Sequence, residues 1–330
     1  MKKLFLVVAI FCLLIVNGVF AQEDTVPPQD LADPDGAFIM LDGVEFYYIA
    51  RGDESAPVVM LLHGFGGSTF TWRDNIDVLV EAGYRAIAYD RPPFGLSDKT
   101  AGLDLTPSAQ ADQAIALMDA LEIETATFIG HSAGGGVISF IAAQYPERVT
   151  AVVFVAGAVA VPSPDPESTP APNSGGGSPI GGIAEMAANL DPNNPVAQNL
   201  VRQFLTPERF VGILASAYHP SFEVTQETKD GYARVLRVDD WEAGLISLFQ
   251  AREGGVPMDF EAFAQFDKPI LIIWGEEDTW VPMARGEAIH AFFPQSQFIT
   301  YPNVGHMAME EATEQFNTDV IAFLATVYSD

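Results

Sequence analysis

The residues best suited to chemistry begin with a serine placed between glycines. Gly130-His131-Ser132-Ala133-Gly134 fits the pattern G-x-S-x-G, in which a serine at a sharp strand-to-helix turn acts as a nucleophile. The pattern alone is weak, but an apolar run at 126–129 precedes it and a helix-like run at 133–144 follows it. This context favours a nucleophilic Ser132 over the alternative that the residue only caps a helix.

A serine hydroxyl is a poor nucleophile near neutral pH and needs a base. His306 follows the strand-like run 297–301, and Asp278 follows a run that ends at Trp274. Residues that end neighbouring parallel strands reach the same edge of a sheet, and the chain order Ser, Asp, His suits this arrangement. We therefore predict Ser132 as the nucleophile, His306 as the general base and Asp278 as the residue that orients the base.

Neighbouring residues offer alternatives for these roles. Glu276 and Glu277 could orient the base, but Asp278 is favoured because the turn after it leads directly into the next helix. The other four histidines are poorer bases, since they lie in a strand-end loop, beside the nucleophile, in an insertion and within a helix (His63, His131, His219 and His290). The segment Asp90–Asp98 is assigned to scaffolding, with a substrate-binding charge at Arg91 as the alternative.

A glycine-rich loop supplies the third part of the predicted site. His63-Gly64-Phe65-Gly66-Gly67 directly follows the buried apolar run 57–62. Acyl transfer passes through an oxyanion, which two backbone N–H groups can stabilise. We assign these donors to Ala133, the residue after the nucleophile, and to Phe65; a merely tight turn is the alternative for the loop. This chemistry needs no metal or organic cofactor, and none is predicted.

The elements that must position these residues alternate between strands and helices. Five runs read as strands (57–62, 84–89, 126–129, 151–155 and 268–274), and the first and the last of them have the continuous apolar pattern of a buried strand. Four stretches between or after them read as helices (71–82, 110–121, 133–144 and 283–293). This alternation predicts an α/β fold with a mostly parallel sheet flanked by helices. Runs 38–41 and 45–49, joined by Asp42-Gly43, predict a hairpin at one edge.

The alternation is interrupted once. Residues 162–182 are rich in Pro, Gly and Ser, which disfavours a continued sheet. Segments with helical character follow, without a convincing strand (195–205, 207–218 and 226–250). We therefore predict an α/β core of residues 37–160 and 257–330, and an α-helical lid inserted between its halves over residues 161–256.

The N-terminus has the composition of a targeting segment. Lys2 and Lys3 precede the apolar stretch Leu4–Val16, and small residues stand before Gln22. This pattern predicts a signal peptide over residues 1–21 and an exported, periplasmic or extracellular protein. The alternative is an uncleaved anchor, the only case in which a membrane association is expected. Residues 22–36 are polar and Pro-rich and read as a linker.

Composition limits the partners further. The chain has 330 residues, 48% of them apolar, enough for one large domain with its own core. A net charge of −28 disfavours binding to nucleic acid. The one cysteine, Cys12, lies in the N-terminal apolar stretch, so no disulfide is expected in the mature chain. A small, ester-like molecule is the expected partner.

These motifs together resemble the lid-bearing α/β hydrolases, which include haloalkane dehalogenases, epoxide hydrolases, C–C bond hydrolases, haloperoxidase-like esterases and lactonases. The matching segments are spread over the predicted core (His63-Gly64, Asp90 to Asp98, Gly130 to Gly134, Gly275 to Asp278 and Gly305-His306). The resemblance implies a serine hydrolase of this fold. Dehalogenases and epoxide hydrolases of the family carry an aspartate nucleophile, so Ser132 argues against both activities.

Ester hydrolysis is the reaction expected of this set of residues, with cleavage of a lactone or of a C–C bond as alternatives that use the same triad. A C–C bond hydrolase would want a cation for its acidic substrate, and four arginines are available (Arg91, Arg202, Arg234 and Arg237). A binding protein with slight turnover is the alternative from another class. Apolar and aromatic residues of the predicted lid are expected to pack on the core or to line an apolar pocket (Phe204, Phe210, Leu214, Tyr218, Phe222, Tyr232, Trp241 and Phe249).

Overall fold

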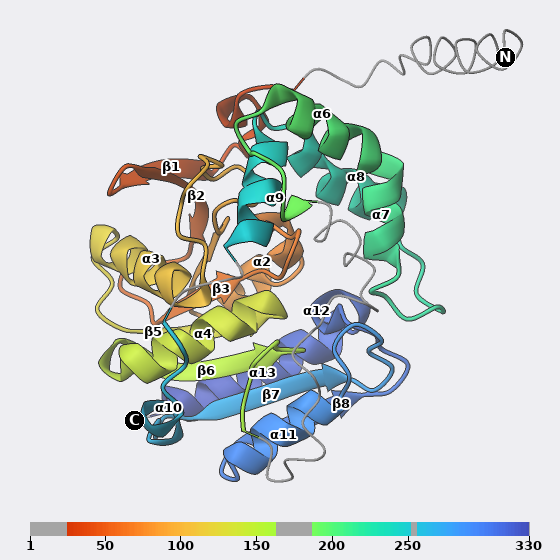
Figure 1. Ribbon diagram of the computed structural model, residues 1–330. Coiled ribbons are helices and arrows are strands. Elements are labelled where there is room, and N and C mark those ends of the chain that lie inside the picture. Colours follow the sequence, from red (N-terminus) through yellow and green to blue (C-terminus); the bar gives the residue numbers. More distant parts are fainter. Residues whose placement is uncertain (1–24, 163–186, 252–255, 330) are drawn as a thin grey trace, which may run out of the picture.

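One sheet of eight strands runs through the centre of the molecule, with helices on both of its faces (Figure 1). The computed structural model describes residues 25–162, 187–251 and 256–329. The predicted signal peptide and almost all of the Pro/Gly/Ser-rich stretch 162–182 lie outside these residues. In the described part of the chain, no helix is long and apolar enough to span a bilayer.

The strand order is β1-β2-β4-β3-β5-β6-β7-β8. The strands are β1 Gly36–Leu41, β2 Val44–Arg51, β3 Val58–Leu62, β4 Arg85–Tyr89, β5 Ala126–His131, β6 Val149–Val155, β7 Ile270–Gly275 and β8 Gln297–Tyr301. β1 and β2 form the predicted antiparallel hairpin, and β2 pairs antiparallel with β4, whereas all neighbouring pairs from β4 to β8 are parallel. The mostly parallel α/β sheet expected from the sequence is thus confirmed.

Helices on the two faces bury both sides of the central strands. One face is covered by α3 Pro107–Ala120, α4 Ala133–Gln144, α10 Phe260–Ala264 and α11 Ala284–Phe292. The other is covered by α2 Ile76–Glu81, α12 Ala308–Glu311 and α13 Thr313–Val327. Successive residues of β3 alternate between the two cores, with Met60 in one and Leu61 in the other. This alternation explains why β3 and β7 read as unbroken apolar runs.

Helices of the insertion group together on one side of the molecule, away from α10, α11 and α13 (Figure 1). They are α6 Pro195–Phe204, α7 Pro207–Ala215, α8 Gln226–Ala233, the 3-10 turn η4 Arg234–Arg237 and α9 Trp241–Gln250. A small apolar core of their own, which includes Val201, Leu236 and Ile246, holds α6, η4 and α9 together. The described residues 187–251 contain only helices and connections, apart from one isolated bridge.

That bridge explains two differences from the sequence-based predictions. The stretch 226–250 has the expected helical character, but it is divided into α8, η4 and α9, with Val238 extended between η4 and α9. Val26 pairs with this residue, donating to the Arg237 carbonyl at 2.8 Å and accepting from the Asp239 N–H at 3.0 Å. The described part of the predicted linker is therefore not a free chain. It packs against the insertion, where Asp33 also pairs with Arg234 at 2.8 Å.

A second predicted helix is also divided. The stretch 71–82 forms the 3-10 turn η2 Thr69–Trp72 and then α2, instead of one continuous helix. Asn75 at the junction is buried, and its side-chain amide donates to Asn317 on α13 at 2.8 Å. A side chain held in this way by a distant helix is a tertiary constraint, which the local periodicity of the segment does not contain.

Candidate active site

The predicted nucleophile lies on a strained turn between β5 and α4. Ser132 has φ 49° and ψ −117°, a conformation that costs a non-glycine residue about 1–3 kcal/mol and clusters at functional sites. Hydrogen bonds on both sides hold it, since its N–H donates to Val155 at 2.9 Å and its carbonyl accepts from Ala158 at 2.8 Å. A Cβ at Gly134 would lie 2.4 Å from the Leu62 carbonyl oxygen, so the turn requires glycine there.

The predicted base and its orienting acid are hydrogen-bonded to each other. His306 Nδ1 lies 2.7 Å from Asp278 Oδ2, and both side chains are buried. The other carboxylate oxygen accepts from the N–H groups of Trp280 and Val281, both at 2.8 Å. With Asp278 held in this way, the Nδ1 proton of His306 points at the carboxylate, which leaves Nε2 free to accept a proton.

The alternative acids have other partners. Glu276 accepts a hydrogen bond from Thr300 Oγ1 at 2.8 Å, and Glu277 accepts one from the Val304 N–H at 3.3 Å. Neither carboxylate is hydrogen-bonded to His306, although both precede Asp278 on the same loop. Of the three acids in this loop, Asp278 is the one in position to orient the imidazole.

The structure brings the nucleophile and the base to the same edge of the sheet. His131, the residue before Ser132, has its ring 4.7 Å from the ring of His306 and its Nε2 at 3.0 Å from the His306 carbonyl. Burial lowers the pKa of His131 far below its usual value, which keeps it neutral and suited to donate from Nε2. Within the described residues, Ser132 Oγ forms no hydrogen bond to His306. Such bonds are often long in ligand-free enzymes and tighten when the substrate binds.

The glycine-rich loop lies directly beside the nucleophile. A Cβ at Gly64 would be 3.1 Å from the Cβ of Ser132 and 2.8 Å from Nδ1 of His131, so only glycine permits this approach. Ala133 begins α4, and its N–H therefore has no acceptor inside the helix. The loop with Phe65 and the start of α4 thus border the same space, as required for two oxyanion donors.

Buried polar residues hold this loop in place. Arg91 donates from Nε and Nη2 to the His63 carbonyl at 3.0 and 2.7 Å, and its N–H donates to His63 Nε2 at 2.9 Å. Burial lowers the pKa of His63 far below its ordinary range, so the ring is neutral. Asp90 accepts from the N–H groups of Thr69 and Leu96, both at 2.6 Å. The segment is scaffolding, as predicted, and Arg91 is not available to a substrate.

Replacing Gly64 with Ala tests this arrangement. The added methyl group would push the loop away from His131 and Ser132, so we expect kcat for an ester to fall about 10²-fold, the usual cost of a lost oxyanion donor. KM should change little. Steady-state kinetics with p-nitrophenyl acetate measure both. Gly212→Ala is the control, because a Cβ at Gly212 meets open space. Wild-type kcat in Gly64→Ala would contradict the predicted role of the loop.

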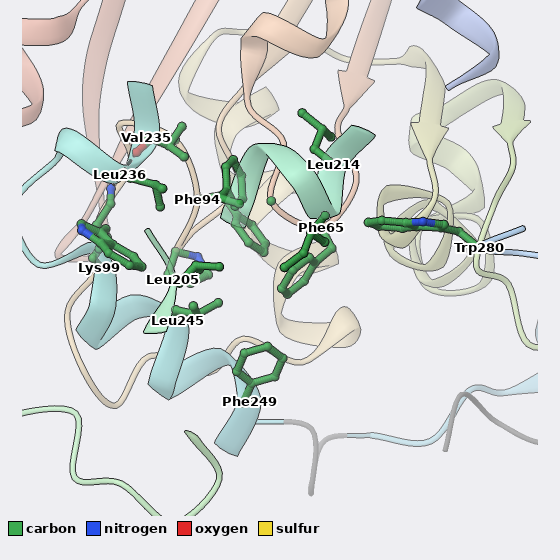
Figure 2. Close-up of a pocket in the computed structure, with 16 residues that line it drawn as sticks. Phe65, Phe94, Lys99, Leu205, Leu214, Val235, Leu236, Leu245, Phe249 and Trp280 are labelled. Carbon is green, nitrogen blue, oxygen red and sulfur yellow. Dashed lines mark hydrogen bonds between the residues drawn. The ribbon is translucent and has the colours of Figure 1, made fainter. Parts of the chain in front are cut away.

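An apolar pocket opens next to these residues (Figure 2). The space between its walls is about 760 Å³ when the open mouth is counted. The walls come from the glycine-rich loop, the Pro93–Gly95 turn, Lys99, the insertion and Trp280 of the loop after Asp278 (Phe65, Gly66, Pro93, Phe94, Gly95, Lys99, Leu205, Phe210, Ile213, Leu214, Val235, Leu236, Trp241, Leu245, Phe249 and Trp280). Trp280 stacks on the His306 ring at 5.6 Å, and it therefore connects the pocket to the predicted base.

The pocket wall offers almost no charge. Among the described residues that line it, Lys99 is the single charged one, and its ammonium group donates to the carbonyls of Gly95 at 2.8 Å and Ser97 at 2.6 Å. Burial lowers the pKa of Lys99 to about 8. None of the four arginines considered for an acidic substrate lines the pocket. Arg202 pairs with Glu242 and Arg234 with Asp33.

The predicted apolar residues of the insertion divide into groups. Four line the pocket (Phe210, Leu214, Trp241 and Phe249). Tyr218 and Tyr232 instead hydrogen-bond to Glu310, and Phe204 is 41% exposed.

Trp280, on the loop after Asp278, is a site residue that the sequence-based predictions missed. Its position two residues after the orienting acid was the one available signal. No group of three His, Cys, Asp or Glu side chains among the described residues is placed to hold a metal ion.

Comparison with known proteins identifies the family. A family model described as alpha/beta hydrolase fold matches residues 57–313. The chain is 27% identical over 284 residues to an uncharacterized hydrolase, YugF, of Bacillus subtilis, covering 86% of this chain and 96% of the relative. It is 31% identical over 281 residues to a 2-hydroxy-6-oxononadienedioate/2-hydroxy-6-oxononatrienedioate hydrolase of Pseudomonas sp, covering 83% and 89%.

Further relatives agree with this result. A bifunctional esterase/perhydrolase of Acinetobacter calcoaceticus is 26% identical over 290 residues, with 86% of this chain and 97% of the relative covered. The crystal structure of a bacterial membrane phospholipase A superposes with a TM-score of 0.71 over the whole of both chains at 21% identity, which shows the common fold. The chain belongs to the α/β hydrolase fold family, and it is a hydrolase.

Proposed function

We propose that the protein is a serine carboxylesterase that cleaves esters of small to medium apolar acids through an acyl-enzyme. The observation that carries this proposal is the His306–Asp278 hydrogen bond of 2.7 Å beside the strained Ser132 turn. A buried imidazole oriented by a carboxylate, next to a serine at a strand-to-helix turn, is the arrangement that acyl transfer needs. The apolar pocket, whose wall includes both Phe65 and Trp280, would hold the acyl chain.

The proposed reaction uses groups of this chain alone. Ser132 Oγ attacks the ester carbonyl while His306 Nε2 takes the hydroxyl proton. The N–H groups of Phe65 and Ala133 stabilise the oxyanion of the tetrahedral intermediate. His306 then gives its proton to the leaving alcohol, and the acyl group stays on Ser132. Water, deprotonated by His306, attacks the acyl-enzyme and releases the acid, with Asp278 holding the imidazole throughout.

Cleavage of a C–C bond in an acidic substrate is the second candidate. It is favoured by the relative named as a 2-hydroxy-6-oxononadienedioate hydrolase. The pocket argues against it, because a dioate brings two carboxylates and the one cation in the wall is bound to two carbonyl oxygens. Burial of an unpaired carboxylate in such an apolar wall would be costly. Ester hydrolysis therefore fits the described site better; lactone hydrolysis uses the same groups.

The helical insertion is proposed to act as the lid of this site. Most of the pocket wall comes from its helices and connections, including Leu205, Phe210 and Phe249. The whole insertion 161–256, between core parts 37–160 and 257–330, would then shape the substrate pocket. From the N-terminal composition we also propose that the enzyme is exported to the periplasm or the cell exterior.

Hydrolysis of a series of p-nitrophenyl esters from acetate to dodecanoate tests the proposal. We expect kcat/KM to be highest for a medium chain, because the apolar pocket wall would bury methylene groups of the acyl chain. A 2-hydroxy-6-oxo dienoic acid is the comparison substrate. Faster turnover of that acid than of every ester would overturn the choice of reaction. Stabilisation by apolar ligands without turnover of either substrate would identify a binding protein instead.

The pocket itself gives a sharper prediction. Leu245→Trp adds bulk to the pocket wall, so kcat/KM for the octanoate should fall about tenfold or more, while that for the acetate should change less than about threefold. Leu200→Trp is the matched control on α6, since Leu200 is 46% exposed and outside the wall. An equal loss for both esters in Leu245→Trp would show that the acyl chain lies elsewhere.

A further inference from the structure

Two adjacent carboxylates on α12 lie close to the proposed base. Glu310 and Glu311 end this short helix, which begins two residues after His306. Neither contacts the pocket or the reacting atoms. Their hydrogen bonds instead run to the helical insertion and to the backbone around His306, and the reaction described above does not use them.

Glu311 receives hydrogen bonds from both sides of the base. Its carboxylate accepts from the N–H of Gly305 at 3.0 Å and from the N–H of Met307 at 3.0 Å. These two residues immediately precede and follow His306. The same carboxylate accepts from the N–H of His219, in the insertion, at 2.7 Å. Three backbone N–H groups from two distant segments therefore donate to the one carboxylate of Glu311.

The insertion also holds the remaining N–H group of this loop. His306 N–H donates to the Ala217 carbonyl at 2.7 Å, so each N–H from Gly305 to Met307 has a partner in Glu311 or in the insertion. The two backbones lie in direct contact, since a Cβ at Gly305 would be 2.7 Å from both the Ala217 oxygen and the His219 nitrogen. Separating the insertion from the core here would break the bonds from His306 to Ala217 and from His219 to Glu311.

Glu310 strengthens the same junction through side chains. Its buried carboxylate accepts from the hydroxyl of Tyr218 at 2.8 Å and from that of Tyr232, both in the insertion. Arg73 of the core donates to it at 2.7 Å. Trp280, whose ring stacks on His306, donates to Ser216 Oγ at 3.1 Å. The connection between α7 and α8 is thus tied to the region around the base by several independent contacts.

We propose that Glu311 is a positioning residue for His306, and that through His219 it couples the placement of the base to the docking of the insertion. This inference rests on the proposed function, since it assigns His306 the role of base. We therefore expect the α7–α8 connection to stay docked on the core during turnover, because undocking it would displace the backbone that carries His306.

Glu311→Gln is the test. The variant keeps the size of the side chain but removes its charge and turns one of two acceptors into a donor, which then faces backbone N–H groups. We expect kcat for p-nitrophenyl butyrate to fall about 10- to 100-fold, with KM changed less than about twofold because Glu311 is outside the pocket wall. Labelling of Ser132 by a fluorophosphonate should slow by the same factor. Glu314→Gln, an exposed acid on α13, is the control and should behave as wild type.

A spectroscopic readout separates positioning from simple stabilisation. The proton between His306 Nδ1 and Asp278 should give a far-downfield ¹H NMR signal, which we expect to shift or broaden in Glu311→Gln and to stay unchanged in Glu314→Gln. A lower Tm with unchanged kcat and an unchanged proton signal would overturn the proposal. If Glu311→Gln does not fold, Glu311→Asp, which keeps the charge, is expected to give a smaller fall in kcat; wild-type kcat there would also overturn it.

The NMR signal also distinguishes the two hypotheses. It needs no substrate, so it reports on the His306–Asp278 pair even if the wild-type protein hydrolyses no ester. Absent turnover and labelling in the wild type would refute the proposed function. A changed proton signal in Glu311→Gln would, in that case, still support the positioning of His306 by Glu311.

Discussion

Ser132→Ala is expected to lower kcat for p-nitrophenyl ester hydrolysis by about 10⁴- to 10⁶-fold, the loss seen when a catalytic serine is removed. The change deletes the one atom that forms the acyl-enzyme and leaves the oxyanion donors and the pocket in place. Alanine can adopt the φ of 49° at a cost similar to that of serine, so the fold and Tm should be retained. Steady-state kinetics and a thermal melt measure both quantities.

Ser139→Ala is the matched control for this experiment. Ser139 is a buried serine on the same helix, α4, and its hydroxyl donates only to the Gly136 carbonyl at 2.6 Å. Its removal should leave kcat within about twofold of wild type while costing about 1 kcal/mol of stability. Retained activity in Ser132→Ala, or an equal loss in both variants, would refute the assignment of the nucleophile.

Asp278→Asn should lower kcat by about 10⁴-fold, because the orienting acid sets the tautomer of the base. The carboxylate accepts three hydrogen bonds, from His306 Nδ1 and from the N–H groups of Trp280 and Val281. An asparagine has one acceptor oxygen and cannot serve all three donors. If the asparagine oxygen faces His306, the N–H groups of Trp280 and Val281 lose their acceptor. If it faces those N–H groups, its NH₂ donates to His306 Nδ1, the imidazole proton moves to Nε2, and His306 can no longer act as the base for Ser132.

Glu276→Gln and Glu277→Gln decide between the acids that the sequence left open. Both side chains bond to other groups, Thr300 Oγ1 and the Val304 N–H, so each variant should keep kcat within about threefold of wild type. The same ester assay compares the three variants. A loss of about 10⁴-fold in either Gln variant, with little change in Asp278→Asn, would move the orienting role to that glutamate.

The composition of the pocket links these predictions to the substrate. The described residues of the wall include one charged group, Lys99, which is bonded to two carbonyl oxygens; this favours the proposed apolar acyl chain over a dicarboxylic acid. Relatives of this hydrolase have names that include both an esterase and C–C bond hydrolases. Because function depends on the residues of a site and not on the fold, the pocket wall is the part of the molecule that bears on the choice between these reactions.

Local signals in the sequence sufficed for the sheet and for the residues assigned to the triad. The buried runs that became β3, β5 and β7 are continuous in the chain, and the turn at Ser132 stands between a strand and a helix that each have their own pattern. His306 and Asp278 could be found because each directly follows such a strand. Parallel strands end at one edge, so positions along the chain predicted convergence in space.

Contacts between distant segments were decided by the tertiary structure alone. Val26 pairs with Val238 between η4 and α9, although neither segment has a strand pattern. Glu311 meets His219 across 92 positions, and Trp280 reaches both His306 and Ser216. Periodicity and motif spacing report on neighbours within a few residues. The partner of a buried carboxylate or a backbone N–H depends instead on how whole elements pack, and the local sequence does not encode that partner.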